Sequence, residues 1–303
     1  MTKAEVTLDE IDAALFRARV PAIAMLRTPN ATDPGTPGCW FGGEPTLPAE
    51  IPWPYYKPTE REAYGIRYED PDLAIPMHFL VQINLAHCPR VLGLPLLPKT
   101  GTIFVFYDPA VAQATDGIAF TTGTGCKVIY VAEDVHACPP RPAPPMPDLS
   151  STEVAMDYLG TSSFNLWPFV FIITDTYLRE SFRGRFFASD LFNKRWDALH
   201  LQIKKDIEEH LGPEAADRRR GKPTGPHFIF GASQQEHFPS AEYLKRTFRG
   251  RTPALTADHT LLFRFVCDEE VGHRTNTGTY LEFWITREDL EKQIFDNIVV
   301  WDY

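Results

Sequence analysis

The residues best suited to metal chemistry lie in the middle of the chain. Cys126, His136 and Cys138 fall within a stretch of thirteen residues, and His87 with Cys88 forms a second soft pair. A zinc site needs four such ligands, and a short turn normally holds two of them together. The chain has no Cys-x-x-Cys pair, and prolines follow Cys138 directly. We therefore predict neither a metal site nor a cofactor.

Nucleophilic catalysis finds little support in the residue pattern. The chain has no Gly-x-Ser-x-Gly motif, which places a serine nucleophile on a sharp turn. The best candidate thiol is Cys39, beside Trp40 at a glycine-containing corner. We interpret Cys39 as a small apolar filler, the usual role of a buried cysteine. No catalytic residue is predicted.

Acidic residues form two groups, one within the charged stretch 57–76 and one directly after an apolar run. Paired carboxylates can serve in glycosidic or metal-dependent chemistry, but most acidic side chains lie in solvent. We predict that both groups belong to a polar rim that binds a protein partner. The predicted partner-binding residues are Glu60, Glu62, Tyr64, Glu69, Asp70, Asp72, Asp268, Glu269 and Glu270.

Two polar residues, Gln82 and Arg264, interrupt otherwise apolar runs. If both point inward they need partners, and a buried arginine demands a carboxylate. One interpretation places them on either side of a cleft between two similar β-units. The other is simple alternation, in which both face water. The two interpretations are balanced for Gln82, whereas Arg264 is expected to be exposed.

The elements that must position these residues begin with the stretch "CWFGGEPTLPAEIPWP" at 39–54. A phosphate-binding glycine loop has to lead into a helix, and the four prolines of this stretch prevent one. We predict a corner of β-structure instead. In it, Gly42 and Gly43 adopt positive φ or let another backbone pass close by.

The rest of the pattern is mainly β. Thr7 and Glu10 have the spacing of a capping box and predict a short first helix. The main expected elements after it are strands at 21–26, 101–108, 126–133 and 167–174, a helix at about 189–211, and two strands, a short helix and a final strand after residue 258.

Two parts of the chain repeat an order of motifs. Phe41-Gly42 and Phe230-Gly231 each precede a strand with one polar residue, and a Gly-Thr pair then opens an aromatic strand in both. We therefore predict one α+β, mainly β domain over residues 1–303, with internally duplicated β-units. The expected parts are halves at about 20–135 and 225–303, joined by a Pro-rich loop at 139–147, the strand at 167–174 and the long helix.

Composition limits the partners. The net charge is −10 and the pI is near 5.4, which disfavours nucleic acid because phosphate binding relies on clustered lysine and arginine. No run of about 18 apolar residues is present, so no membrane span is expected. The N-terminus lacks the apolar stretch of a signal peptide, and five scattered cysteines suit reduced thiols. We expect a cytoplasmic protein.

The chain resembles the YwqG-like family of bacterial proteins in three successive segments. These are the corner, the following "HFLVQINL" and then "LPLLPKTGTIFVFYD". The residues that carry this resemblance are Phe41, Gly42, Gly43, Pro45, Pro48, Trp53, Pro54, Leu80, Gln82, Ile83, Leu97, Pro98 and Gly101. The C-terminal stretch "YLEFWITREDLEKQIFDNIVVWDY" is also similar, although Arg264 replaces the glutamine expected in the second half. The resemblance implies a mainly β, duplicated fold. It also suggests a role among immunity proteins that bind bacterial toxins.

Taken together, these observations favour a non-enzymatic, cytoplasmic protein-binding inhibitor whose partner is a cognate toxin. The absence of an assembled catalytic motif and the acidic charge, which would attract a basic toxin, support this hypothesis. The alternative is an enzyme or small-ligand-binding protein that uses a cleft between the two β-units, near Gln82 and Arg264.

Overall fold

A computed structural model of the chain describes residues 6–56, 74–107, 119–121, 125–135, 137–147, 163–177, 189–211, 227–233, 258–266, 268, 270–272 and 280–302. The fold is mainly β, as the sequence predicts. The elements up to the middle of the chain are α1 (Leu8–Arg17), β1 (Arg19–Arg27), β2 (Trp40–Phe41), β3 (Tyr55–Tyr56), β4 (Ile75–Pro76), β5 (His78–Asn84), the 3-10 helix η1 (Leu85–His87), β6 (Thr102–Tyr107), β7 (Ala119–Thr121) and β8 (Cys126–Val131). The later elements are β9 (Trp167–Tyr177), α4 (Asp190–Leu211), β10 (His227–Ile229), β11 (His259–Val266), β12 (Tyr280–Thr286), α7 (Arg287–Glu291) and β13 (Val299–Asp302).

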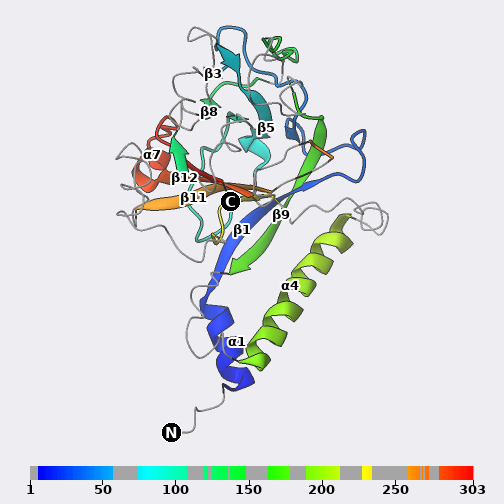
Figure 1. Cartoon of the computed structure of the whole chain (residues 1–303), viewed down its shortest axis with the longest axis vertical. Helices are drawn as coiled ribbons and strands as arrows, with labels where there is room; N and C mark the ends of the chain where they lie inside the picture. The colour runs from blue at the N-terminus through cyan, green and yellow to red at the C-terminus, as the bar shows by residue number, and fades with distance from the viewer. Residues whose placement is uncertain are drawn as a thin grey trace.

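Eleven strands form one sheet in the order β7-β13-β12-β11-β10-β1-β9-β2-β5-β6-β8, and β3 pairs with β4 separately. The central pair, β1 and β9, is antiparallel from Arg19 opposite Tyr177 to Arg27 opposite Phe169. Figure 1 shows these two long strands running side by side through the molecule. On one side of this pair β10, β11, β12 and β13 follow, and on the other side β2, β5, β6 and β8 follow in the same chain order.

The sheet curls so that its two ends approach each other. Its terminal strands, β7 and β8, are consecutive in the chain, since β7 ends at Thr121 and β8 begins at Cys126. The segment before β13 also reaches β8: Lys127 forms an ion pair with Asp296, and the rings of Tyr130 and Phe295 lie 5.7 Å apart. One hydrophobic core accordingly contains side chains from both halves of the sheet.

The glycine corner adopts the predicted conformation. Gly42 and Gly43 have φ values of 57° and 68°. The chain at Asn165 crosses directly over them, and a Cβ atom added at Gly42 would lie 2.2 Å from the Asn165 carbonyl oxygen. Both features are those expected from the sequence, because only glycine combines a positive φ with so close an approach.

The backbone at Phe230 makes a hydrogen bond similar to that of Gly42, at a position one residue away from the one that the sequence comparison aligned. The Gly42 amide donates to the Leu80 carbonyl oxygen at 2.9 Å, and the Phe230 amide donates to Leu262 at 3.0 Å. Phe230 also has a positive φ, 59°. The amide that makes this bond belongs to Phe230, whereas the sequence comparison aligned Gly42 with Gly231.

The proline-rich segment packs against the corner. Arg141, within this segment, donates to the carbonyl oxygens of Ile51 and Pro48 at 2.6 and 3.2 Å. Trp53 donates from Nε1 to the Met77 carbonyl oxygen at 2.9 Å. These bonds give partners to carbonyl oxygens of residues that lie outside the strands.

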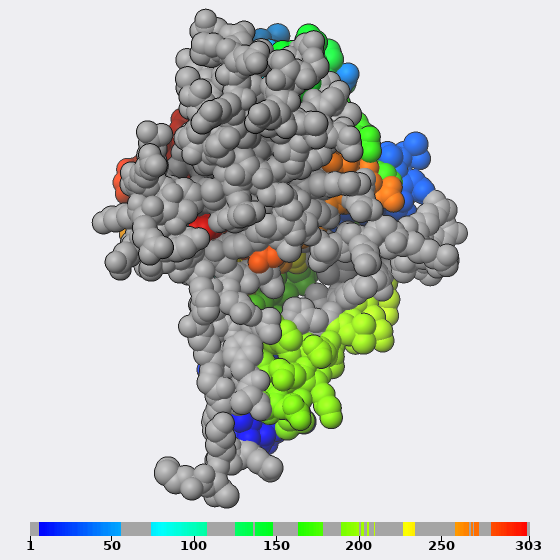
Figure 2. All heavy atoms as spheres, in the orientation of Figure 1, coloured from blue at the N-terminus to red at the C-terminus, as the bar shows by residue number. Residues whose placement is uncertain are grey.

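Helices α1 and α4 lie side by side and project from one end of the sheet (Figure 1). The capping box predicted at Thr7 and Glu10 is present. Ile11 and Leu15 pack against Phe192, forming a small core separate from that of the sheet. In the face shown in Figure 2, atoms of α4 are exposed in the lower part of the molecule. None of the described helices has the length and apolar run that a membrane span requires.

Candidate functional site

Only two of the predicted partner-binding residues are described by the structure, Asp268 and Glu270. Glu270 is exposed, as a rim residue must be, whereas Asp268 is only 2% exposed. Its carboxylate binds groups inside the protein, so Asp268 is not part of an exposed rim. The other predicted residues lie outside the described residues: Glu60, Glu62, Tyr64, Glu69, Asp70, Asp72 and Glu269.

The Asp268 carboxylate binds two backbone amides and lies against the side chains of Arg27 and His227. Oδ2 accepts from Nε of Arg27, which lies on central strand β1. Oδ1 accepts from the amides of Glu270 and Val271 at 3.1 and 3.4 Å. A buried carboxylate is stable only with such partners. The local sequence resembles a solvated strand end because the charged partner, Arg27, is distant in the chain.

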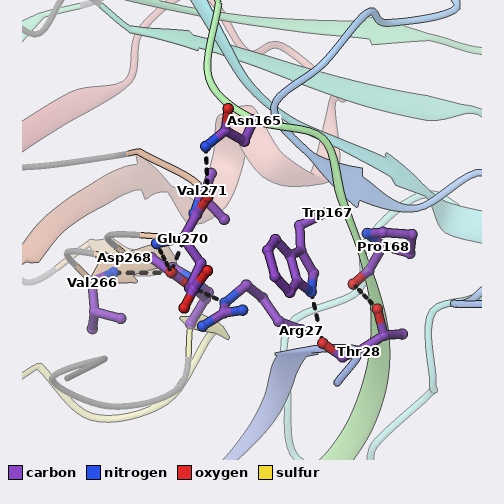
Figure 3. Close-up of polar contacts among 10 residues, drawn as sticks. Arg27, Thr28, Asn165, Trp167, Pro168, Val266, Asp268, Glu270 and Val271 are labelled. Atoms are coloured by element: carbon purple, nitrogen blue, oxygen red, sulfur yellow. Dashed lines mark hydrogen bonds and ion pairs between the residues drawn. The ribbon is translucent and has the colours of Figure 1, made fainter. Parts of the chain in front are cut away.

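Arg27 is held between Asp268 and an aromatic ring. Its guanidinium lies 4.5 Å from the centroid of the Trp167 ring, and Figure 3 shows the two side chains alongside each other. Trp167 is fixed in turn, since its Nε1 donates to the Thr28 carbonyl oxygen at 2.6 Å. A cation over an indole ring is favourable when it is partly desolvated.

His227, on β10, contacts the same carboxylate oxygen of Asp268 as Arg27 does. Its Nδ1 accepts from the Val266 amide at 3.1 Å, so the ring proton belongs on Nε2, which lies 3.6 Å from Asp268 Oδ2. Burial alone would raise the pKa of Asp268. The contacts with His227, Arg27 and the Val271 amide outweigh burial and lower that pKa to about 2. The carboxylate is therefore ionised throughout the physiological range.

Asn165 joins this cluster to the glycine corner. Its backbone amide donates to the Val271 carbonyl oxygen at 2.7 Å, and its side-chain Nδ2 donates to the Glu270 carbonyl oxygen at 2.8 Å (Figure 3). The same residue crosses Gly42 at close range. The corner that is most conspicuous in the sequence thus holds the segment that fixes the Asp268 loop.

Gln82 does not face a cleft or water. It is fully buried, and its Oε1 accepts from the amide and the hydroxyl of Thr46 at 2.9 and 3.2 Å. Its Nε2 donates to the Gly38 carbonyl oxygen at 3.3 Å. These bonds connect strand β5 to Thr46 within the corner and to Gly38 directly before it, and they account for a polar residue within an apolar strand.

Arg264 is buried, contrary to the expectation that it faces water. It lies directly opposite Glu282 in the pairing of strands β11 and β12. Its Nη1 donates to the Ala232 carbonyl oxygen at 3.1 Å, and its guanidinium lies 4.4 Å from the centroid of the Phe228 ring. Burial lowers its pKa, and the nearby Glu282 charge opposes that change. Glu282 accepts from the Ser233 hydroxyl at 2.7 Å. The carboxylate that a buried arginine requires is thus present.

The buried thiols are poor nucleophiles. Burial raises the pKa of both Cys39 and Cys88 to about 12, although a backbone contact with Asn84 and the charge of Arg90 respectively oppose it. Burial raises the pKa of Cys126 as well. Since the thiolate is the reactive form, these three thiols stay protonated and inert at neutral pH. Cys39 is the buried filler that the sequence suggests.

A cavity of about 620 Å³ lies where the two ends of the sheet approach each other. Its lining comes from residues 51–55, 127–130 and 293–296 together with Met77, and we call it the seam groove. β8 pairs with β6 on one side, and no strand among the described residues pairs with its other edge. Trp53 packs on one face of β8 and Phe295 on the other.

Sequence reasoning did not identify this groove. The run at 126–133 was predicted as a strand, but its place at the end of the sheet depends on pairings with distant segments. Tyr55 and Ile294 are exposed apolar side chains in the groove, but single exposed apolar residues are common on protein surfaces.

Comparison with protein-family models identifies the family of the chain. A family model described as "Domain of unknown function (DUF1963)" matches residues 40–302. The match covers most of the chain, including the glycine corner, Asp268 and all three segments that line the seam groove. No curated protein matches the chain.

Proposed function

The chain belongs to the DUF1963 family, and from that premise we propose that it is a non-enzymatic protein-binding inhibitor. The observation that carries the proposal is the seam groove, which combines an apolar lining with an unpaired strand edge among the described residues. Exposed apolar patches next to polar surroundings are typical of protein-binding surfaces. The net charge of −10 favours a basic partner.

In its finer form the proposal makes the chain a YwqG-like immunity protein that neutralises a bacterial toxin. It also makes the two halves of the sheet products of a duplication. Support for duplication comes from the matching order of strand pairing on either side of β1 and β9. The register shifts between Phe79 and Val81 in one half and between Leu261 and Phe263 in the other support it further.

The test is co-expression of the chain with the product of a neighbouring gene in a sensitive bacterial host. If the neighbour is a toxin, the chain should restore growth, and the two purified proteins should form a stable complex on gel filtration. A catalytically inactive toxin variant serves as the binding control. Toxicity that the chain leaves unchanged contradicts the proposal.

A second candidate function, binding of a small ligand, is favoured by the volume of the same groove. Small-molecule sites commonly measure about 300 to 1,000 Å³ and are lined mainly by apolar and aromatic groups, and the groove has about 620 Å³. Native mass spectrometry of the purified chain distinguishes the two candidates. A bound small molecule that is released on denaturation supports this second function over the first.

A further inference from the structure

We propose that the seam groove receives an extended segment of a partner protein, which adds to the free edge of β8 as a further β-strand. This inference rests on the proposed protein-binding function and specifies how binding occurs. It joins two observations made on described residues, the unpaired edge of β8 and the apolar walls on both sides of it, with the net charge of the whole chain.

The edge of β8 supplies the hydrogen-bonding groups. β8 has six residues and is antiparallel to β6 along its whole length, from Tyr107 opposite Cys126 to Thr102 opposite Val131. Every second residue of an edge strand points its N–H and C=O away from its neighbour. About three residues of β8 therefore direct a donor and an acceptor outward, and strand addition satisfies these groups with a peptide backbone.

The walls of the groove fit the two faces of such a strand. Ile129 packs with Ile51 and Trp53 on one face of β8, and Tyr130 packs against Phe295 on the other. Side chains of an added strand alternate between these two walls. Because both walls are apolar, the partner segment should be apolar at consecutive positions, in contrast to a strand with one solvated face.

The charge of the chain indicates what flanks that apolar segment. Asp296 is 73% exposed and is already paired with Lys127, so the attraction comes from the net charge of −10 that the chain as a whole carries. A lysine or arginine at one end of the partner segment is therefore favoured by electrostatic attraction. The occupant to which we commit is a partner segment of about six mainly β-branched or aromatic residues followed by a basic residue.

The experiment selects peptides from a displayed library of random sequences of about twelve residues on the full-length chain, and measures their affinity by fluorescence anisotropy. Selected peptides should share an apolar run with a flanking basic residue. Methylation of single backbone nitrogens should weaken binding about tenfold or more at every second position of the run, because only alternate amides face β8. Tolerance of methylation at all positions, or failure to select any peptide, overturns the proposal.

Two matched substitutions place the binding site. Ile294→Asp puts a charge in the groove at a residue that is 39% exposed, and Ile173→Asp makes the same change on β9, at a residue that is 56% exposed. The first should weaken peptide binding about tenfold or more, while the second should leave the affinity within about twofold. Circular dichroism checks that both variants fold. Equal effects of the two substitutions on peptide affinity overturn strand addition. A dimer of the chain that the peptides fail to disrupt overturns it as well.

Failure of this proposal can be told apart from failure of the proposed function. If co-expression restores growth but no peptide binds the groove, inhibition stands and strand addition is wrong. If peptides bind with the alternating dependence and no neighbouring gene product is toxic, strand addition stands and the immunity role is wrong.

Discussion

At the scale of single residues, Asp268 is a buried charge whose stability depends on a distant partner. Arg27 is nearly buried beside it, and a buried cation whose partner is removed costs several kcal/mol, because the charge keeps its desolvation penalty and loses its attraction. The pair joins central strand β1 to the loop after β11. Its loss should therefore affect the stability of the whole sheet.

We predict that Asp268→Asn lowers the free energy of unfolding at pH 7 by about 3 to 5 kcal/mol. The folded-state pKa of Asp268, about 2, lies below the ordinary value of 3.8. Its contribution is therefore fully present above about pH 4 and is lost as the pH falls from about 4 to 2. The difference in unfolding free energy between wild type and variant should shrink over that interval. Urea unfolding at several pH values measures it.

The matched control is Asp12→Asn. Asp12 also pairs with an arginine, Arg195, at 2.8 Å, but both side chains are nearly half exposed. Exposed ion pairs contribute about 0 to 1 kcal/mol, so this variant should lose little stability at any pH. Equal losses of unfolding free energy for Asp12→Asn and Asp268→Asn at pH 7 would mean that the buried ion pair stabilises the fold no more than the exposed one.

How much a residue pattern predicts depends on the range of the interactions involved. Gly42 and Gly43 were predicted to form a corner because prolines close by exclude a helix, and this is a local argument. Asp268 was expected on the surface because its partner Arg27 is 241 residues away. Arg264 was misjudged for the same reason, since Glu282 lies opposite it on another strand.

At the scale of elements, helices α1 and α4 depend on each other. The small core between them contains Phe192, which is fully buried against Ile11 and Leu15. An isolated helix of ten residues such as α1 is marginal in water. Its stability therefore comes mainly from packing against α4, in addition to its N-terminal capping box.

We predict that Phe192→Ala costs about 3 to 5 kcal/mol in the local stability of this helix pair, through lost burial and the cavity that remains. Hydrogen exchange should accelerate in α1 and in the N-terminal part of α4, while the amides of β6 stay protected. The neighbouring Leu191→Ala is the control, because Leu191 is exposed and should change exchange little. Loss of protection throughout the sheet in the Phe192 variant would show that the pair is not a separate unit.

The positions of the elements also divide into those that the local sequence predicts and those that depend on distant segments. Thr7 and Glu10 predict the start of α1 from spacing alone, and the capping box is confirmed. The apolar run at 126–133 predicts a strand, and β8 occupies most of it. Its position at the end of the sheet, which creates the seam groove, depends on the pairing of β6 with β5 and β8, and no property of the run itself contains that information.

At the scale of the whole molecule, the two halves of the sheet share one hydrophobic core. Side chains of β5, β6 and β8 in the first half belong to the same cluster as those of β11, β12 and β13 in the second. The central pair β1 and β9 crosses between the halves, since β9 pairs with β2 and β1 pairs with β10. Each half of the sheet thus pairs with a strand from outside its own part of the chain: β2 of the first half pairs with β9, and β10 of the second half pairs with β1.

We predict that the sheet unfolds in a single cooperative transition and that neither half folds alone. A fragment of residues 20–135 lacks β9 and the second half of the core, and a fragment of residues 225–303 lacks β1, so each would expose apolar surface that the intact chain buries. Tryptophans lie in both halves, among them Trp53 and Trp301, so fluorescence reports on the whole sheet. Fluorescence and far-ultraviolet circular dichroism should give coincident urea transitions for the full chain and no transition for either fragment. Two separated transitions, or a cooperative transition in one fragment, would mean that each β-unit is stable by itself and that the shared core contributes little to folding.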